Sequence, residues 1–188
     1  MILRKICLYC GLTPQRVFGK TGRAYVLTRI DNYNHAARFS RWAALVDLDR
    51  EPNCVPEFVS KVLPHPSRCM SFRVAVRSVE SWLLADRERL ARFLAVSEAV
   101  VPADPDALAD PKAAMLTLAR RSSSSRIRRD MVPRAQGGAV EGPAYASRLQ
   151  EFVNQISASW RVSVAARNSG SLRRCVAALR RLRHCAPE

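Results

Sequence analysis

The chain has 188 residues, enough for one domain with a hydrophobic core, and 48% of its residues are hydrophobic and 25% charged. This composition excludes a wholly disordered chain, and no apolar stretch approaches the roughly 20 residues that cross a bilayer. Basic residues outnumber acidic ones by 31 to 16, and the net charge of +15 favours a polyanionic partner such as nucleic acid. The N-terminal apolar run is too short for a signal peptide, so we expect a cytoplasmic protein without a membrane segment.

Arginine supplies most of this charge. Of the 31 basic residues four are lysine, which leaves 27 arginines. A GC-rich genome is an alternative origin for part of this excess, because such a bias favours arginine codons. It does not require a low number of acidic residues, so the charge imbalance still indicates a phosphate-bearing ligand.

Hydrophobic periodicity predicts strands that alternate with helices, followed by helices alone. The apolar runs 42–46 and 70–76 are short and continuous, as in inner strands of a parallel sheet, and 16–18 is a third strand candidate. The sequence therefore predicts an α/β fold with a helical C-terminal extension. The predicted helices are a segment ending at residue 10, an interrupted stretch over 25–37, and the ranges 56–63, 78–94, from 111 onward, 145–157, 160–167 and 171–184.

The composition changes at residues 120–138, where arginine and serine dominate before a pair of glycines. We expect a flexible basic segment that separates an α/β core over 1–118 from helices over 142–188, with a Ser/Arg/Gly-rich loop over 119–141 between them. Its arginines, and one lysine before it, are candidates for phosphate contacts; the alternative is a solvated loop. These candidates are Lys112, Arg120, Arg121, Arg126, Arg128 and Arg129.

The six cysteines do not have the pattern of a disulfide framework. Cys7 with Cys10, and His65 with Cys69, would offer two pairs of soft ligands to a zinc ion. The first pair lies in a helix-like run, however, and the second has a looser spacing than zinc knuckles use. We therefore expect buried or idle thiols rather than a zinc site.

Asp47 and Asp49 directly follow the apolar strand 42–46. Ligands of parallel α/β sheets collect beyond the carboxyl ends of the strands, and residues i and i+2 of an extended segment point the same way. The pair is therefore a candidate site for Mg²⁺ or Mn²⁺, and Glu80, which follows the next strand, is predicted at the same rim of the sheet. The alternatives are solvated or helix-capping aspartates and, for Glu80, a carboxylate favoured by the helix dipole. Asp86 lies two turns further along and is a weaker candidate.

Two other enzyme classes use an Asp-x-Asp pair. Haloacid-dehalogenase-type phosphatases normally carry Thr or Val two positions beyond the second aspartate, where this chain has Glu51. Nucleotide-sugar transferases bind a metal with such a pair, but this chain is short and strongly basic for that class. No Walker loop, nucleophile elbow or zinc-protease motif is present in the sequence.

Further motifs follow the strand that ends in Val46-Asp47-Leu48-Asp49. They are Glu80-x-Trp82-x-x-Ala85-Asp86, Asp110-Pro111-Lys112, Met131-Val132-Pro133 and Gly142-Pro143-Ala144-Tyr145. In this order they resemble a family of small Toprim-like proteins of unknown function, some of which are encoded beside ATPases in bacterial phage-defence loci. The resemblance runs from about Gly11 nearly to the C-terminus, and the Glu-x-Trp-x-x-Ala-Asp stretch is its most specific part.

The resemblance implies a mostly parallel Toprim-like sheet flanked by helices, with Asp47 and Asp49 as ligands of Mg²⁺ (or Mn²⁺) and Glu80 as an additional acid. In the family a further glutamate lies on the first strand, in a Val-Glu-Gly-type turn. This sequence opens inside the helix that should follow that strand, so we expect the first strand to be truncated, misassigned or lost, and cleavage to be weak.

The function implied by the resemblance is that of a magnesium-dependent protein that cleaves or otherwise processes nucleic acid, with nuclease-type phosphodiester chemistry. It implies bacterial phage defence with a partner ATPase, and it favours DNA over RNA as the substrate. A non-catalytic module that binds nucleic acid or a protein partner on the same fold is the alternative. A metal-dependent phosphotransfer enzyme for small nucleotides is a third possibility.

Overall fold

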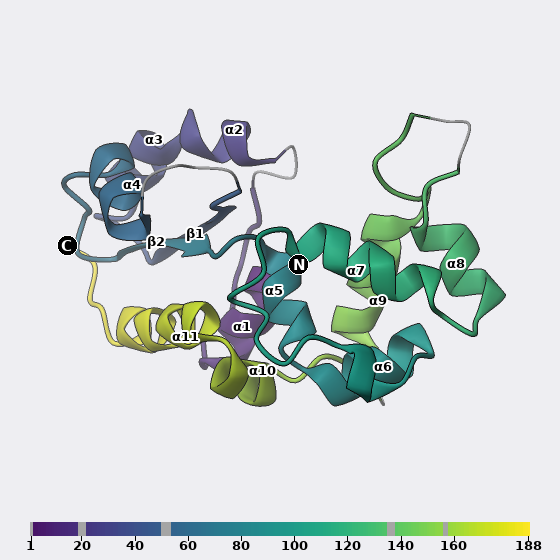
Figure 1. Ribbon diagram of the computed structural model, residues 1–188. Helices are drawn as coiled ribbons and strands as arrows, with labels where there is room; N and C mark the ends of the chain where they lie inside the picture. The colour runs from purple at the N-terminus through teal and green to yellow at the C-terminus, as the bar shows by residue number, and fades with distance from the viewer. Residues whose placement is uncertain (1, 19–21, 50–53, 135–137, 156–157) are drawn as a thin grey trace. The chain divides into compact units, whose positions relative to one another are not determined.

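The computed structural model describes residues 2–18, 22–49, 54–134, 138–155 and 158–188. The chain divides into two compact units. The first, here the sheet unit, consists of Leu3–Ser78 and Gly170–Glu188, and the second, the helical unit, is built mainly from Val79–Ser169. The α11 helix, which the sequence places in a C-terminal helical extension, therefore belongs to the same unit as the sheet (Figure 1).

The sheet unit is an α/β structure with helices on both faces of a parallel strand pair. Strand β1 pairs with β2 in parallel, with Trp42 opposite Met70 and Asp47 opposite Ala75. A parallel pair needs a crossover connection, and α4 supplies it. The elements are α1 (Ile2–Tyr9), α2 (Arg23–Leu27), α3 (Ile30–Ala36), β1 (Trp42–Asp47), α4 (Val55–Val62), β2 (Met70–Ala75) and α11 (Gly170–Arg183).

The two faces of the strand pair pack against different helices. Helices α2 and α3 contact β1, α4 contacts β2, and their apolar side chains share a core with alternate strand residues such as Val46 and Phe72. On the other face α11 packs along β2, below the strands in the view of Figure 1. Because the Ser171 hydroxyl accepts a hydrogen bond from the Val76 N–H at 3.1 Å, α11 begins where β2 ends and runs antiparallel to it.

The sheet is smaller than the sequence predicts. Within the described residues β1 and β2 are the only strands, and 16–18 is irregular chain. Val17 and Phe18 are half exposed, so this short run lacks the burial that would support a third strand. The described residues thus form a mixed helix–strand fold around two parallel strands, which agrees with the predicted α/β class.

The helical unit contains α5 (Val79–Leu84), α6 (Arg87–Leu94), the single turn η1 (Glu98–Val100), α7 (Pro111–Arg120), α8 (Ser125–Met131), α9 (Tyr145–Asn154) and α10 (Val162–Asn168). The buried indole of Trp160 lies at its centre and donates to the Trp82 carbonyl at 2.9 Å. Helix α7 begins as the sequence predicts, because the Asp110 carboxylate accepts from the Ala113 N–H and Pro111 occupies the first turn.

The single helix predicted over 78–94 is wrong, because the chain breaks at Asp86 between α5 and α6. The Asp86 side chain is fully buried. Its carboxylate accepts hydrogen bonds from the Arg161 backbone N–H at 2.8 Å, from Nε at 3.0 Å and from Nη2 at 2.6 Å. The hydrogen bond to Asp86 also raises the pKa of Arg161 above its usual value. This inward-facing carboxylate sets the position of the break.

The segment predicted to be a flexible basic loop contains a helix. The Ser124 hydroxyl caps α8 by accepting from the Ile127 N–H. Ile127 and Met131, one turn apart, are buried and hold the helix on the unit, while Arg126, Arg128 and Arg129 are exposed. Residues 135–137 of the predicted loop lie outside the described residues.

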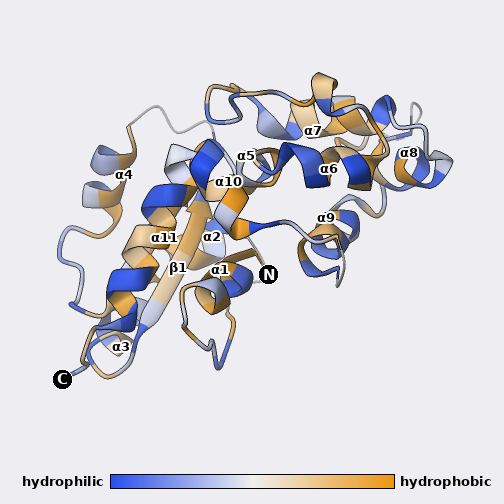
Figure 2. Ribbon diagram, turned by 90° about the horizontal axis from the view of Figure 1, so that it is seen from below, coloured by the Kyte–Doolittle hydropathy of each residue, from blue (hydrophilic) through white to orange (hydrophobic). Residues whose placement is uncertain are grey.

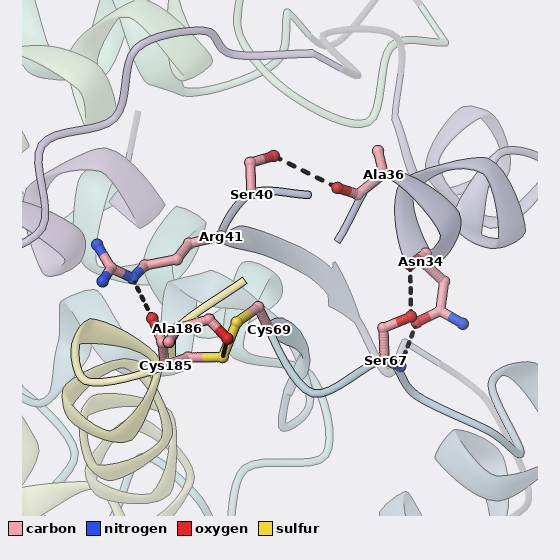
Figure 3. The surroundings of a disulfide bond; sticks show 8 residues. All are labelled: Asn34, Ala36, Ser40, Arg41, Ser67, Cys69, Cys185 and Ala186. Atoms are coloured by element: carbon pink, nitrogen blue, oxygen red, sulfur yellow. Dashed lines mark hydrogen bonds between the residues drawn. A yellow bond between two sulfur atoms is a disulfide. The ribbon is translucent and has the colours of Figure 1, made fainter. Parts of the chain in front are cut away.

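A disulfide joins Cys69 to Cys185 across 116 residues, with the two Cα atoms 5.6 Å apart (Figure 3). The sequence predicted no disulfide framework, and this pair corrects that expectation. The antiparallel packing of α11 on β2 brings the two cysteines together, and a pairing over such a distance is not readable from sequence spacing. Beside the bond, Arg41 Nε donates to the Cys185 carbonyl at 2.8 Å. The other cysteines are free, and Cys7, Cys10 and Cys175 are buried as predicted.

Among the described residues, no helix is both long enough and apolar enough to cross a membrane.

We predict that reduction of the disulfide destabilises the sheet unit. Opening a loop of this length gives the unfolded chain more freedom, and the free energy of unfolding should fall by about 2–4 kcal/mol. Thermal unfolding with and without dithiothreitol measures the change, and the Cys69→Ser/Cys185→Ser variant should melt like the reduced protein. The Cys54→Ser variant, which removes an exposed free thiol, is the control. An unchanged melting temperature in reductant would contradict the prediction.

We also predict that Asp86→Asn destabilises the helical unit by about 3 kcal/mol, because it removes the charge that compensates the Arg161 guanidinium. Urea unfolding followed by tryptophan fluorescence measures this, since Trp82 and Trp160 are buried in this unit. Glu88→Gln is the matched control: Glu88 contacts the same guanidinium at 2.8 Å but is exposed, so its loss should matter far less. Equal effects of the two variants would show that burial of the pair is unimportant.

Candidate functional site

Asp47 and Asp49 lie at the carboxyl end of β1, as the sequence predicts. Asp47 is the last residue of the strand, and its side chain is partly exposed. Leu48 is buried in the core between the two aspartates. The backbone of this segment continues along β2, because the Leu48 and Asp49 N–H groups donate to the carbonyls of Ala75 and Arg77, both at 2.9 Å. The position of the pair is therefore fixed by the strand pairing.

Asp49 departs from the extended conformation assumed in the prediction. Its φ is +53°, in the left-handed region that Asp tolerates better than most residues. The rule that residues i and i+2 point the same way holds for an extended segment and does not apply across this residue. The backbone leaves the extended conformation at Asp49, and the carboxylate of this residue is about half exposed, at 53%.

Arg23 is the residue at this site that the sequence analysis missed. Its Nη1 lies 3.6 Å from Asp49 Oδ2 and donates to the Leu48 carbonyl at 3.2 Å. The guanidinium also stacks over the Phe58 ring, 4.9 Å from its centroid. A cation thus already neighbours the carboxylate of Asp49. Nothing in the spacing of Arg23 marks it, because the contact depends on the packing of α2 beside β1.

Glu80 lies in the first turn of α5, as predicted, and this helix belongs to the helical unit. Its side chain is 8% exposed, and Oε1 accepts a hydrogen bond from the Tyr145 hydroxyl at 3.1 Å. Burial, together with the Glu80 carboxylate, raises the pKa of Tyr145 above its usual value, so the phenol stays protonated and donates. The meeting of Glu80 with Asp47 and Asp49 at one rim stays a prediction.

Lys112 also lies near Glu80. Its ammonium is 5.4 Å from the centroid of the Tyr145 ring and forms an ion pair with Glu141. Burial lowers the pKa of Lys112, but Glu141 and then Glu80 outweigh that effect, so the net shift is upward and the lysine stays charged. This candidate for a phosphate contact is thus paired with Glu141 and lies in the electrostatic field of Glu80.

The motifs that carry the family resemblance meet around this cluster in the helical unit. Asp110-Pro111-Lys112 opens α7, and Tyr145 opens α9 over Glu80. Gly142 lies against the end of α8, where a Cβ atom would be 2.6 Å from the Asp130 carbonyl oxygen, so only glycine fits there. These motifs also contact residues outside them, because Trp160 donates to the Trp82 carbonyl and Arg161 to the Asp86 carboxylate. Packing and hydrogen bonding within the unit therefore account for the motifs.

No group of three or more His, Cys, Asp or Glu side chains gathers to hold a metal ion within the described ranges. A pair of carboxylates completed by water and phosphate oxygens, as Mg²⁺ often uses, has only two protein ligands. Residues 50–53, which follow Asp49 and include Glu51, lie outside the described residues.

The predicted phosphate-binding arginines surround α8 of the helical unit and are exposed. Three of them also have intramolecular partners. Arg128 donates to the Ser122 carbonyl, Arg129 donates to Asp130 at 3.1 Å, and Arg126 Nε lies 3.9 Å from the same carboxylate. The hydrogen bond from Arg148 holds the pKa of Asp130 below its usual value, so this carboxylate stays charged. Arg120 and Arg121 end α7 and leave their charge at the surface.

Comparison of the chain with known protein families, with curated proteins and with solved structures finds no match.

We predict that Arg23 competes with a metal ion at Asp49. Arg23→Gln removes one cation beside the carboxylate and should strengthen Mn²⁺ binding about fivefold, as expected for a half-exposed charge pair. Isothermal titration with MnCl₂ measures it. Arg29→Gln, which removes an equal charge next to Tyr25, is the control. If Arg23→Gln weakens binding instead, the arginine positions the carboxylates rather than competing at them.

Proposed function

We propose that this protein is a Toprim-like, magnesium-dependent protein that cleaves or processes nucleic acid, with Asp47 and Asp49 as its metal ligands. The observation that supports this most is the place of the pair: directly at the carboxyl end of a strand in a parallel pair, where α/β proteins bind ligands. The net charge of +15 provides the attraction for a polyanionic substrate.

The donor set fits a hard cation. Asp49 offers an exposed carboxylate, and Asp47 offers a second one at the end of the same strand. Mg²⁺ takes one or two such carboxylates in many proteins and leaves its other positions to water and phosphate oxygens. When bound, the ion would supply charge stabilisation to a phosphodiester.

The residues around the pair have distinct parts in this proposal. Asp47 and Asp49 bind, and the backbone hydrogen bonds to Ala75 and Arg77 keep them at the strand end. Arg23, next to Asp49, would neutralise a phosphate oxygen once the metal ion holds the carboxylate. Glu80 is retained as an additional acid, although its hydrogen bond from Tyr145 already uses one of its oxygens.

A non-catalytic nucleic-acid-binding module is the second candidate, and one observation favours it. Arg23 forms an ion pair with Asp49, so an internal cation takes the place next to the carboxylate. An aspartate paired with an arginine in this way can stabilise a turn without a metal ion. If Asp49 has only this structural role, binding of nucleic acid would depend on the basic surfaces alone.

The remaining parts of the proposal rest on the family resemblance alone. They are a bacterial origin, a role in phage defence, a partner ATPase, and DNA rather than RNA as the substrate. A cytoplasmic location is also proposed, independently of the resemblance. Contacts of Lys112 and of the arginines around α8 with phosphates belong to the same proposal.

We predict that any plasmid nicking by this chain requires Mg²⁺ or Mn²⁺ and falls at least about 100-fold in the Asp47→Asn/Asp49→Asn variant. This variant loses the two carboxylates that would hold the metal ion, and with the ion the positive charge that would stabilise the reacting phosphate. Nicked and supercoiled plasmid are separated on a gel over time. Asp31→Asn, an exposed aspartate of the same unit, is the control and should cut like the unmodified chain. Glu80→Gln tests the additional acid.

Two outcomes would decide between the candidates. DNA binding without any metal-dependent cutting would favour the non-catalytic module. Cutting that persists in the double variant at the control's rate would overturn the assignment of the two aspartates.

A further inference from the structure

The exposed face of α11 is a row of cations without an acidic residue. The opposite face is apolar and buried, with Leu172, Leu179 and Leu182 against the sheet unit. Figure 2 shows both blue and orange residues along this helix. The exposed residues are Arg173, Arg174, Ala177, Arg180, Arg181, Arg183 and His184. In the described part of the chain, no carboxylate forms an ion pair with these arginines.

Arg73 extends this charge onto the sheet. It lies on β2, on the face that packs against α11, and its Nε is buried without a hydrogen-bond partner among the described residues. Burial lowers its pKa, and repulsion from Arg181 and Arg174 adds to that effect, which the Cys175 thiol opposes. Clustered like charges attract an anion, which reduces their mutual repulsion. Arg73, Arg174 and Arg181 together therefore favour a bound anion.

A hollow of about 390 Å³ lies at the C-terminal end of α11. Its lining includes Tyr9, Arg180, Arg183 and His184, so an aromatic ring and three basic side chains surround it. Tyr9 is 43% exposed, and the Arg180 guanidinium lies 5.6 Å from its ring centroid. The Arg183 guanidinium packs on Gly11, where a Cβ atom would lie 2.9 Å from it, and both residues line the hollow.

We propose that the exposed face of α11, together with the hollow at Tyr9, binds the backbone of single-stranded nucleic acid. From Arg173 to Arg183 the arginines lie along about 15 Å of helix, a length that a few consecutive phosphates span. Tyr9 offers a stacking surface to one base, and only unpaired bases have a face free to stack in this way. A duplex would use the arginines but not the tyrosine.

The surface leads to the aspartate pair. Helix α11 begins where β2 ends, and Asp47 lies opposite the last residue of β2. A strand bound along α11 would therefore extend toward Asp47 and Asp49. The inference rests on the proposed function for the nature of the ligand, but it requires neither a metal ion nor cleavage.

Fluorescence anisotropy in EDTA tests it, with a labelled single-stranded DNA, an RNA of the same sequence, and the matching DNA duplex. Arg180→Gln/Arg181→Gln should weaken single-strand binding at least roughly tenfold and reduce the slope of log K against log salt by about 1.4, because two phosphate contacts are lost. The matched control, Arg16→Gln/Arg68→Gln, removes two exposed charges from the same unit and should change binding far less. Arg180→Lys/Arg181→Lys keeps the charge and should retain most of the binding.

Variants of Tyr9 distinguish the binding of single strands from the binding of duplex. Tyr9→Ala should weaken single-strand binding about fivefold or more and leave duplex binding unchanged, whereas Tyr9→Phe should behave as the unmodified chain. The DNA and RNA arms show which nucleic acid is preferred. Circular dichroism on each variant confirms that it is folded.

Equal binding by Arg180→Gln/Arg181→Gln and by its control would overturn the proposal. So would binding to phosphatidylserine vesicles with no binding to any oligonucleotide, since the face would then recognise a lipid surface. If Asp47→Asn/Asp49→Asn binds in EDTA as tightly as the unmodified chain, the surface stands even where cleavage fails. Loss of cutting with intact binding, or the reverse, thus identifies which proposal has failed.

Discussion

The buried carboxylate of Asp86 constrains the helical unit more than any other single group described above. A fully buried charge is tolerated only when it is paired and hydrogen-bonded, and Arg161 supplies both its backbone N–H and its guanidinium. To meet this residue, the chain must break between α5 and α6 and bring the start of α10 alongside. That arrangement places Trp160 against the Trp82 carbonyl. The most specific motif of the sequence, Glu-x-Trp-x-x-Ala-Asp, is therefore one that holds helices together.

Many of the charged residues of the helical unit are paired with one another. Glu80, at the head of the same motif, is committed to Tyr145, and Lys112 is committed to Glu141. The sheet unit differs, because its charges are less completely compensated. Asp49 is exposed beside one arginine, and α11 presents its arginines without carboxylate partners in the described residues. Residues whose partners are not supplied by the fold are the better candidates for contacts with a ligand.

The elements that the sequence predicted correctly are those determined by residues close together in the chain. The continuous apolar runs gave β1 and β2, Asp110 with Pro111 gave the start of α7, and the periodicity of 171–184 gave α11. Of the candidate site, the place of Asp47 and Asp49 at the strand end was predictable for the same reason. The break at Asp86, the ion pair of Arg23 and the Cys69–Cys185 disulfide depend on partners far along the chain, which periodicity does not contain. Helix α8 was not predicted, because the many arginines and serines indicated a loop and the two buried residues Ile127 and Met131 are too few to give a clear helical pattern.

The sheet unit is assembled from two stretches of chain with the helical unit synthesised between them. During translation, the face of β2 that carries Ser71 and Arg73 has no cover until α11 emerges, after all of Val79–Ser169. The helical unit is built mainly from the continuous stretch Val79–Ser169, so it has no such delay. Cys69 must likewise wait for Cys185, and the other thiols made before then are Cys7, Cys10, Cys54 and Cys175. Correct pairing in the finished protein therefore depends on the earlier thiols being withdrawn into the core or kept reduced while the ribosome completes the chain.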